Sequence, residues 1–289
     1  MNYTLNGHNS FYIREGWLGK GYTFIKNQEE ISANLFYKTN IKTIDKLGMG
    51  SMMVQSLRFW LQVFGIIEKQ KNKWKLSKIA IEIFEKDKYL QKNSSLWLLH
   101  YNILNKEEEK PLYWYLVFQE KKNLNTFKKD QLKDIANIFA IENTLKVSDK
   151  TLKDGLNVFI KTYIHEKFNK NSPEENMFSP FSRLKYLVKN EEGYRFRNIN
   201  SDEISENIVL YILLDQLNNQ EKLSLGKAFD IINGIIRMSY IEFEKIISKL
   251  ENNELIKVDR AGGLDNIIFN ENIKKYEILT AILEGESIL

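Results

Sequence analysis

The stretch that decides the fold is "GMGSMMVQSLRFWLQVFGIIEKQKNKWKLS", residues 48–77. Gly48 and Gly50 predict a tight turn, and Ser51 is expected to cap the helix that follows. Apolar residues at helical spacing then predict the buried face of this helix, which Gly65 ends. The buried residues are Val54, Leu57, Leu61 and Phe64, and the opposite face carries Gln55, Arg58, Phe59 and Gln62.

The segments on either side of this helix complete a recognisable pattern. A short helix is expected over residues 41–47, and residues 66–77 predict a β-hairpin with its turn near Asn72. In the return strand Trp74 and Leu76 alternate with lysines, as strand residues with one buried face do. Helix, glycine turn, longer helix and basic hairpin together predict a winged helix-turn-helix.

Positive charge gathers on this predicted unit. Between Lys42 and Lys78 there are eight basic residues and only Asp45 and Glu68 as acidic ones. Phosphate contacts in this motif come from such positions, and base edges are read from the start of the second helix. The predicted DNA-binding residues are Ser51, Met52, Gln55, Arg58, Lys69, Lys71, Lys73 and Lys75. The alternative is a protein-binding module whose hairpin lysines form a solvated edge.

The C-terminal part has the same predicted order of elements, two helices followed by a hairpin. "LSLGKAFDIINGIIR", residues 223–237, and "MSYIEFEKIISKLENN", residues 238–253, predict two helices, the second with a capping box of Ser239 and Glu242. A hairpin around Gly262 and Gly263 follows. The charges on the exposed face of the second helix are mixed, which favours protein contact there.

The predicted fold class is mainly α, with two winged helix-turn-helix units flanking a helical middle domain and short β-hairpin wings. The expected domains are residues 1–92, 93–190 and 191–289. Helices are expected over residues 27–37, capped by Asn27, and after Thr126, and a small strand at "GYRFRNI", residues 193–199. The many aromatic residues of the middle predict a large core, and residues 168–180 an exposed loop.

The stretch "GHNSFYIREGWLGKG", residues 7–21, allows two interpretations. Its glycines oppose a helix, each by about 1 kcal/mol relative to alanine, and its spacing differs from that of a phosphate-binding P-loop. In one interpretation His8, Arg14 and Lys20 bind an anion with help from backbone amides. In the other the stretch is a clasp, whose apolar residues pack on the first winged helix: Phe11, Ile13, Trp17 and Leu18.

Signals for catalysis are weak. The chain has no cysteine, which excludes disulfides and thiolate nucleophiles. His8, His100 and His165 are far apart, and neither a zinc-binding H-E-x-x-H nor a G-x-S-x-G motif is present. His100, in "LWLLHY", is expected to be a core histidine. The sequence therefore predicts no catalytic residue, metal site or cofactor, and the absence of a long apolar run predicts a cytoplasmic protein.

Two blocks resemble the N-terminal signature of an uncharacterised bacterial family, a domain of unknown function. They are "GHNSFYIREGWLGKG" and "LGMGSMMVQSLRFWLQVFGII", and "SLWLLHYNIL", "YWYLVF" and "FSPFSRLKYLV" are similar to weaker central blocks. The chain departs from the family at Asn9, where an acidic residue is common, and at Ser51–Met52, where Lys-Asn is common. The similar positions are Gly7, His8, Phe11, Arg14, Trp17, Leu18, Lys20, Gly48, Gly50, Met53, Val54, Ser56, Arg58 and Trp60.

The resemblance implies a genomic context rather than a reaction. Genes of this family lie beside genes for phosphoadenosine-phosphosulfate-reductase-like sulfurtransferases, in DNA phosphorothioation and phage-defence islands. The expected function is a non-catalytic accessory protein that docks on double-stranded DNA and contacts a sulfurtransferase or another defence-system protein, without a membrane. The alternatives are an adaptor that does not bind DNA, a transcriptional regulator of the defence operon and, last, a nuclease, which would need carboxylates that converge in a cleft with a divalent metal. The oligomeric state stays open.

Overall fold

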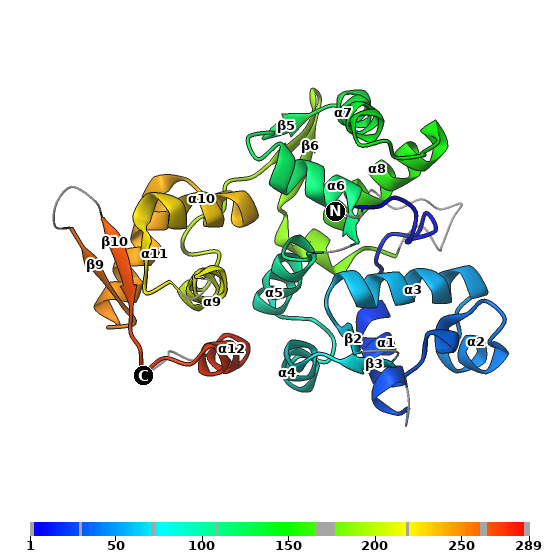
Figure 1. Cartoon of the computed structure of the whole chain (residues 1–289), viewed down its shortest axis with the longest axis horizontal. Coiled ribbons are helices and arrows are strands. Elements are labelled where there is room, and N and C mark those ends of the chain that lie inside the picture. The colour runs from blue at the N-terminus through cyan, green and yellow to red at the C-terminus, as the bar shows by residue number, and fades with distance from the viewer. Residues whose placement is uncertain are drawn as a thin grey trace. The chain divides into compact units, whose positions relative to one another are not determined.

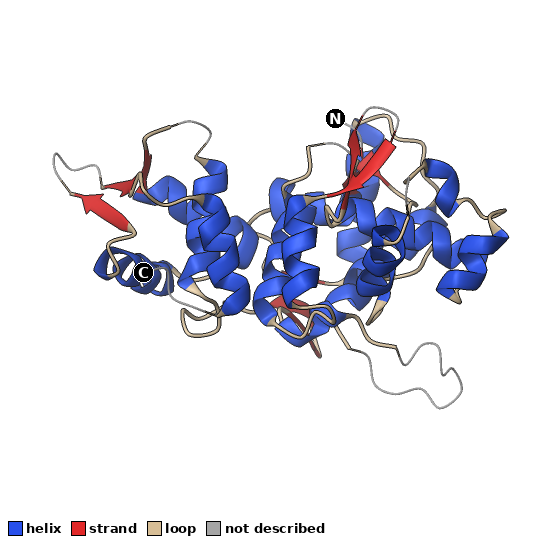
Figure 2. Ribbon diagram, turned by 90° about the horizontal axis from the view of Figure 1, so that it is seen from below, coloured by secondary structure: helices blue, strands red, loops and turns tan. Residues whose placement is uncertain are grey.

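A computed structural model of the chain describes residues 3–28, 31–70, 73–107, 109–165, 177–217, 220–260 and 265–285. The architecture is mainly helical with a few small sheets, as expected (Figure 2). Two compact units are present, one formed by residues 1–91 and 102–196 and the other by residues 92–101 and 197–289. The three-part division and the winged-helix assignment stay predictions.

The first unit begins with helices and a hairpin, coloured blue to cyan in Figure 1. Helix α1 packs on α3, and α2 packs on both. The elements, in chain order, are β1 (Tyr3–Thr4), α1 (Trp17–Lys26), the 3-10 helix η1 (Ala33–Phe36), α2 (Ile41–Leu47), α3 (Ser51–Val63), β2 (Ile67–Gln70), β3 (Lys73–Leu76) and α4 (Lys78–Lys86).

Helix α1 corrects two sequence predictions. It includes Gly19 and Gly21, where glycine was expected to oppose a helix, and Asn27 is its C-cap and not the N-cap of a helix over 27–37. The reason is close packing: a Cβ atom at Gly21 would lie 2.9 Å from the side chain of Leu61 on α3. Burial of the apolar face of α1 between its neighbours outweighs the low helix propensity of glycine.

The turn between α2 and α3 has the predicted glycines. Gly48 ends α2 with φ +58°, a left-handed conformation that glycine adopts without strain. The cap of α3 was predicted wrongly, because Gly50 is the N-cap and Ser51 is the first helical residue. The buried stripe of Val54, Leu57 and Leu61 is confirmed.

The remainder of the first unit is helical around an aromatic core, as predicted. Trp114, Phe118 and Phe159 are buried, and Trp114 Nε1 donates a hydrogen bond to the hydroxyl of buried Tyr163 (2.8 Å). The expected cap at Thr126 is wrong, since this residue lies in a strand and Lys128 precedes the helix. Residues 93–101 of α5 (Asn93–Leu104) belong to the second unit. The elements of the first unit that follow are β4 (Lys110–Pro111), α6 (Leu112–Tyr115), the π-helix η2 (Leu116–Glu120), β5 (Thr126–Phe127), α7 (Lys129–Glu142), α8 (Asp149–Tyr163), η4 (Pro180–Leu184), β6 (Leu187–Asn190) and β7 (Gly193–Phe196).

Small sheets join distant parts of this unit. Strand β1 pairs in parallel with β4, β2 pairs with β3 in an antiparallel hairpin, and β7 lies between β5 and β6. Strand β7 is the small strand predicted at residues 193–199. Most of the expected loop at 168–180 lies outside the described residues.

The second unit contains the predicted C-terminal helices and hairpin. Ser239 accepts a hydrogen bond from the amide of Glu242 (3.3 Å), so half of the predicted capping box forms. The Glu242 carboxylate instead binds the hydroxyl of Ser201 (2.6 Å). Strand β10 lies between β8 and β9, and Gly262 and Gly263 lie outside the described residues. The elements are α9 (Glu206–Gln216), β8 (Lys222–Ser224), α10 (Leu225–Ile236), α11 (Tyr240–Asn252), β9 (Ile256–Asp259), β10 (Asn266–Phe269) and α12 (Lys275–Glu284).

None of the helices in the described ranges is both long enough and apolar enough to cross a membrane.

Candidate functional site

One face of α3 remains open after the helix has packed. Its partly exposed side chains follow the spacing i, i+4, i+7 and i+11, which places them in one row along the helix. The row consists of Ser51, Gln55, Arg58 and Gln62, and Met52, which is 46% exposed, lies beside its start. Three of the predicted base-reading residues therefore share a face.

Arg58 is the charged member of this row. Its Nε atom is buried without a hydrogen-bond partner, and its guanidinium forms no ion pair with any residue that the structure describes. A guanidinium has five donors in a planar fork. Arg58 therefore keeps donors available for an acceptor outside the chain.

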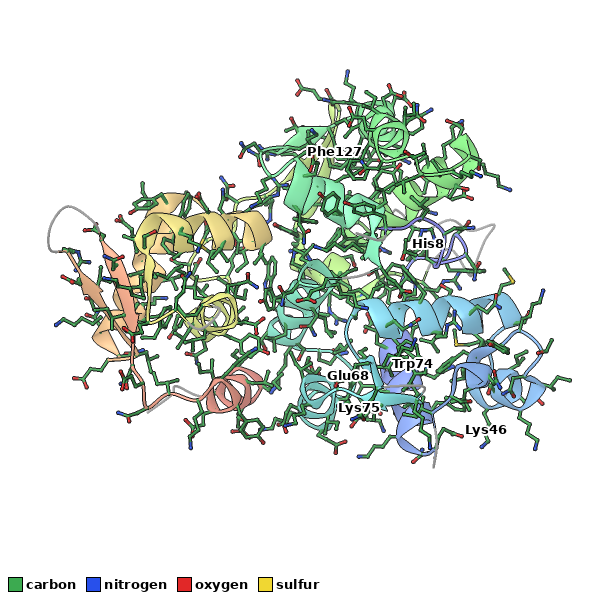
Figure 3. All side chains as sticks on the ribbon, in the orientation of Figure 1. His8, Lys46, Glu68, Trp74, Lys75 and Phe127 are labelled. Carbon is green, nitrogen blue, oxygen red and sulfur yellow. The ribbon has the colours of Figure 1, made fainter. Side chains whose placement is uncertain are left out.

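The β2–β3 hairpin divides the predicted lysines between its two faces. Glu68 pairs in register with Lys75, and Lys69 with Trp74. Lys73 and Lys75 therefore share the outer face with Glu68, while Lys69 lies on the face of Trp74. Figure 3 labels Glu68, Trp74 and Lys75. Lys75 Nζ lies 3.5 Å from a Glu68 carboxylate oxygen, and both side chains are half-exposed. Lys71 lies outside the described residues.

The N-terminal segment packs against the other side of α3. Trp60 Nε1 donates a hydrogen bond to the carbonyl oxygen of Phe11 (3.0 Å). Gly7 lies so close to Phe59 that a Cβ atom there would stand 2.3 Å from the ring. Phe59 is 7% exposed, so the sequence prediction that it lies on the exposed face of the helix is wrong. The N-terminal segment packs over Phe59 and buries it.

The structure separates the three predicted anion-binding residues into two places. Arg14 and Lys20 line one pocket, with Lys46 of α2 (labelled in Figure 3). His8 lies apart, beside Trp60 and next to a small cavity lined by Tyr113 and Gly155. Burial lowers the pKa of His8 to about 4, against the opposing effect of Asp154, so that the ring is neutral at pH 7.

Sequence reasoning missed part of this pocket. Lys88 and Tyr89, which follow α4, line it together with Lys46. These residues come from separate helices and connections, and no spacing in the sequence relates them. The sequence indicated Lys46 of α2 only as one of the eight basic residues between Lys42 and Lys78.

Charged residues of α11 in the second unit form ion pairs. On α11, Lys245 pairs with Glu242 (2.6 Å), and Glu251 pairs with Arg260 (3.5 Å). The mixed face predicted from the sequence is thus made of charges that neutralise one another. His100 is fully buried, and its Nε2 lies 3.0 Å from the carbonyl oxygen of Ile235, as expected for a core histidine.

The comparisons with known proteins establish the family. The model of the family described as "Protein of unknown function (DUF4007)" matches residues 5–284, and the chain belongs to this family. No curated protein is significantly similar in sequence. Two solved structures share the fold, a magnesium-ion-bound SspB and a second SspB structure. Each has a TM-score of 0.79 and 17% sequence identity, over 98% of this chain and 87% of SspB.

The magnesium ion in one SspB structure raises the question of a metal site here. In the part of the chain that the structure describes, no three histidine, cysteine, aspartate or glutamate side chains gather closely enough to hold a metal ion.

Proposed function

We propose that this chain is a non-catalytic accessory protein of a bacterial DNA-modification or anti-phage system, and that it docks on duplex DNA. The docking surface consists of the open row of α3 and the outer face of the β2–β3 hairpin, in a winged helix-turn-helix arrangement. The resemblance implies that genes of this family lie in phosphorothioation islands, and this supports a role in a DNA-modification or anti-phage system. The surface described above supports duplex DNA as the partner.

The observation that carries the proposal is the open row of α3 with Arg58 in it. An arginine whose guanidinium has no partner among the described residues can bind a phosphate or the edge of a guanine. Gln55 and Ser51, one and two turns earlier, offer amide and hydroxyl groups that suit base edges. Lys73 and Lys75 of the hairpin add positive charge for the DNA backbone.

Removal of the hairpin charges tests the proposal. The variant Lys71→Ala, Lys73→Ala, Lys75→Ala should bind a labelled duplex more weakly, with a shallower dependence on salt. A matched control replaces three exposed lysines elsewhere in the first unit: Lys122, Lys146 and Lys150. Both variants lose three positive charges. The hairpin variant should therefore lose more affinity than the control only if the hairpin is part of the docking surface. Equal affinities of the two variants would contradict the proposal.

The absence of catalysis is the second part of the proposal and has its own test. Supercoiled plasmid incubated with the full chain and Mg²⁺ should stay supercoiled. Appearance of nicked or linear plasmid that scales with protein would contradict the non-catalytic assignment while leaving DNA docking intact.

An adaptor without DNA affinity is the second candidate, because apolar side chains are exposed on the same elements. Ile41 of α2 is 69% exposed and Met52 of α3 is 46% exposed. Such side chains suit a protein partner better than a phosphate backbone. The adaptor predicts that Met52→Ser and Ile41→Ser weaken capture of a sulfurtransferase while the hairpin lysine variant leaves that capture unchanged.

A further inference from the structure

The first unit contains a pocket that the proposed docking does not use. It lies where the start of α1, the end of α2 and the segment after α4 meet, and its volume is about 630 Å³. Small-molecule sites in proteins commonly occupy 300–1,000 Å³, so the pocket has the size of a ligand site.

The charge of the pocket favours an anion. The lining includes Arg14, Lys20, Lys46 and Lys88, with Glu15 as the carboxylate among the described lining residues. That carboxylate is already bound by Arg183, whose Nη1 lies 3.1 Å and 3.2 Å from its two oxygens. Positive charge is therefore in excess among the described lining residues.

Arg14 gives the most direct indication of a ligand. The residue is 7% exposed, and its guanidinium carbon lies 5.5–5.7 Å from the centres of three aromatic rings, those of Phe11, Tyr12 and Trp17. Its side chain forms no hydrogen bond or ion pair with any described residue, and its Nε is fully buried. Aromatic rings stabilise the charge in part, but the donors lack acceptors among the described residues. A buried cation in this state is stabilised by an anion.

The start of α1 adds backbone donors at the same place. Gly16 is the N-cap, with φ +76°, and it offers no side-chain cap. The amide of Trp17 donates a hydrogen bond to the carbonyl oxygen of Arg14 (3.1 Å), so the amides of Leu18 and Gly19 are the donors left in the first turn. The first turn has no acidic residue, so the positive end of the helix dipole is not neutralised there. Gly16 and Gly19 both line the pocket, which brings these amides to the ligand, as in known phosphate sites at helix N-termini.

An aromatic ring completes the pocket. Tyr89 is 66% exposed although it lines the pocket, and Lys88 Nζ lies 5.5 Å from the centre of its ring. An exposed ring beside a cationic wall is suited to stack on a planar base. The volume also exceeds what a phosphate group alone would fill.

We propose that this pocket binds a nucleoside phosphate, with its phosphate groups at Arg14 and the start of α1 and its base against Tyr89. The remaining phosphate charge is neutralised by Lys46 and Lys88. This inference is independent of duplex docking, because the pocket and the open row of α3 consist of different residues.

Isothermal titration calorimetry of the full chain in a phosphate-free buffer tests the proposal without DNA. The probes are ADP, GDP, pyrophosphate and adenosine. At least one nucleoside diphosphate should bind, pyrophosphate should bind more weakly, and adenosine should not bind. Absence of binding by both diphosphates at millimolar concentration would overturn the proposal. Equal affinity for pyrophosphate and the diphosphates would overturn the role of the base.

Variants locate the binding in this pocket. Lys46→Ala should raise the Kd for the diphosphate about fivefold or more, because one charge-assisted contact is lost. Lys42→Ala, an exposed lysine of the same helix that does not line the pocket, is the matched control and should leave the Kd unchanged. Arg14→Lys should weaken binding further. If Arg14→Lys does not fold, Lys88→Ala replaces it and should also raise the Kd. Unchanged affinity in Lys46→Ala and Lys88→Ala would overturn the proposal.

Discussion

Gly19 of α1 lies directly against the carbonyl oxygen of Lys88: a Cβ atom at position 19 would stand 2.7 Å from that oxygen. The oxygen belongs to the backbone, so it cannot rotate away as a side chain could. This contact fixes α1 against the segment that follows α4, and both residues line the charged pocket.

Replacement of this glycine should therefore destabilise the chain. We expect Gly19→Ala to lower the free energy of unfolding by about 1–3 kcal/mol, because overpacking outweighs the gain in helix propensity. Gly226→Ala is the matched control, since a Cβ atom there meets nothing within 4 Å. It should leave stability unchanged or raise it by up to about 1 kcal/mol. Chemical denaturation measures both, and a stable Gly19→Ala would contradict the close contact.

The hydrogen bond from Trp60 to the carbonyl oxygen of Phe11 predicts a second effect on stability. Trp60 is fully buried, so Trp60→Phe removes a donor and leaves a cavity, and the free energy of unfolding should fall by about 2–4 kcal/mol. Trp74→Phe, on the half-exposed face of the hairpin, should lower it by less than about 1 kcal/mol. Similar losses in the two variants would contradict the anchoring of the N-terminal segment on α3.

Two buried histidines predict how stability depends on pH. Burial lowers the pKa of His8 and of His100 to about 4 each, whereas an unfolded histidine titrates near 6.5. Between these values the unfolded chain binds protons that the folded chain does not, so stability is full above about pH 6.5 and falls toward pH 4. At about pH 5 each histidine should lower it by about 2 kcal/mol.

Chemical denaturation at a series of pH values, together with NMR of the imidazole signals, checks this prediction. Both rings should stay neutral in the folded chain at about pH 5.5. A normal titration of either ring near pH 6.5 would contradict its burial.

Arg58 should be decisive for duplex affinity if α3 faces DNA. We expect Arg58→Ala to weaken binding at least about tenfold, as loss of a charged contact does. Arg195→Ala removes an exposed arginine from β7 of the same unit and should change affinity little. Anisotropy measures both, with thermal melting to verify folding, and equal effects would indicate that general charge rather than α3 governs binding.

Local patterns allowed much of the fold to be predicted. The buried stripe of α3, the hairpin after it and the cap at Ser239 each depend on neighbours in sequence, which spacing reveals. Helix α1 was missed because its glycines oppose a helix locally, and only contact with Leu61 and Lys88 explains their presence. In α1 the free energy of tertiary packing outweighs the low helix propensity of glycine.

The candidate sites were predictable to different degrees. The open row of α3 lies on one helix, so a helical period predicts Ser51, Gln55 and Arg58 together. The pocket joins α1, α2 and the segment after α4, and its residues meet only through the tertiary fold. Sequence spacing could therefore indicate Arg14 and Lys20 but not their association with Lys88.

The central claim is that α3 and the hairpin dock on duplex DNA, and a salt titration tests it most directly. Anisotropy of labelled duplexes, plain and phosphorothioated, should give an affinity that falls linearly against salt on a log–log plot, with a slope of about −0.9 for each phosphate contact. A steep slope that becomes shallower in the Lys71, Lys73, Lys75 variant is the predicted result. No binding to either duplex at low salt would contradict the account and favour the adaptor.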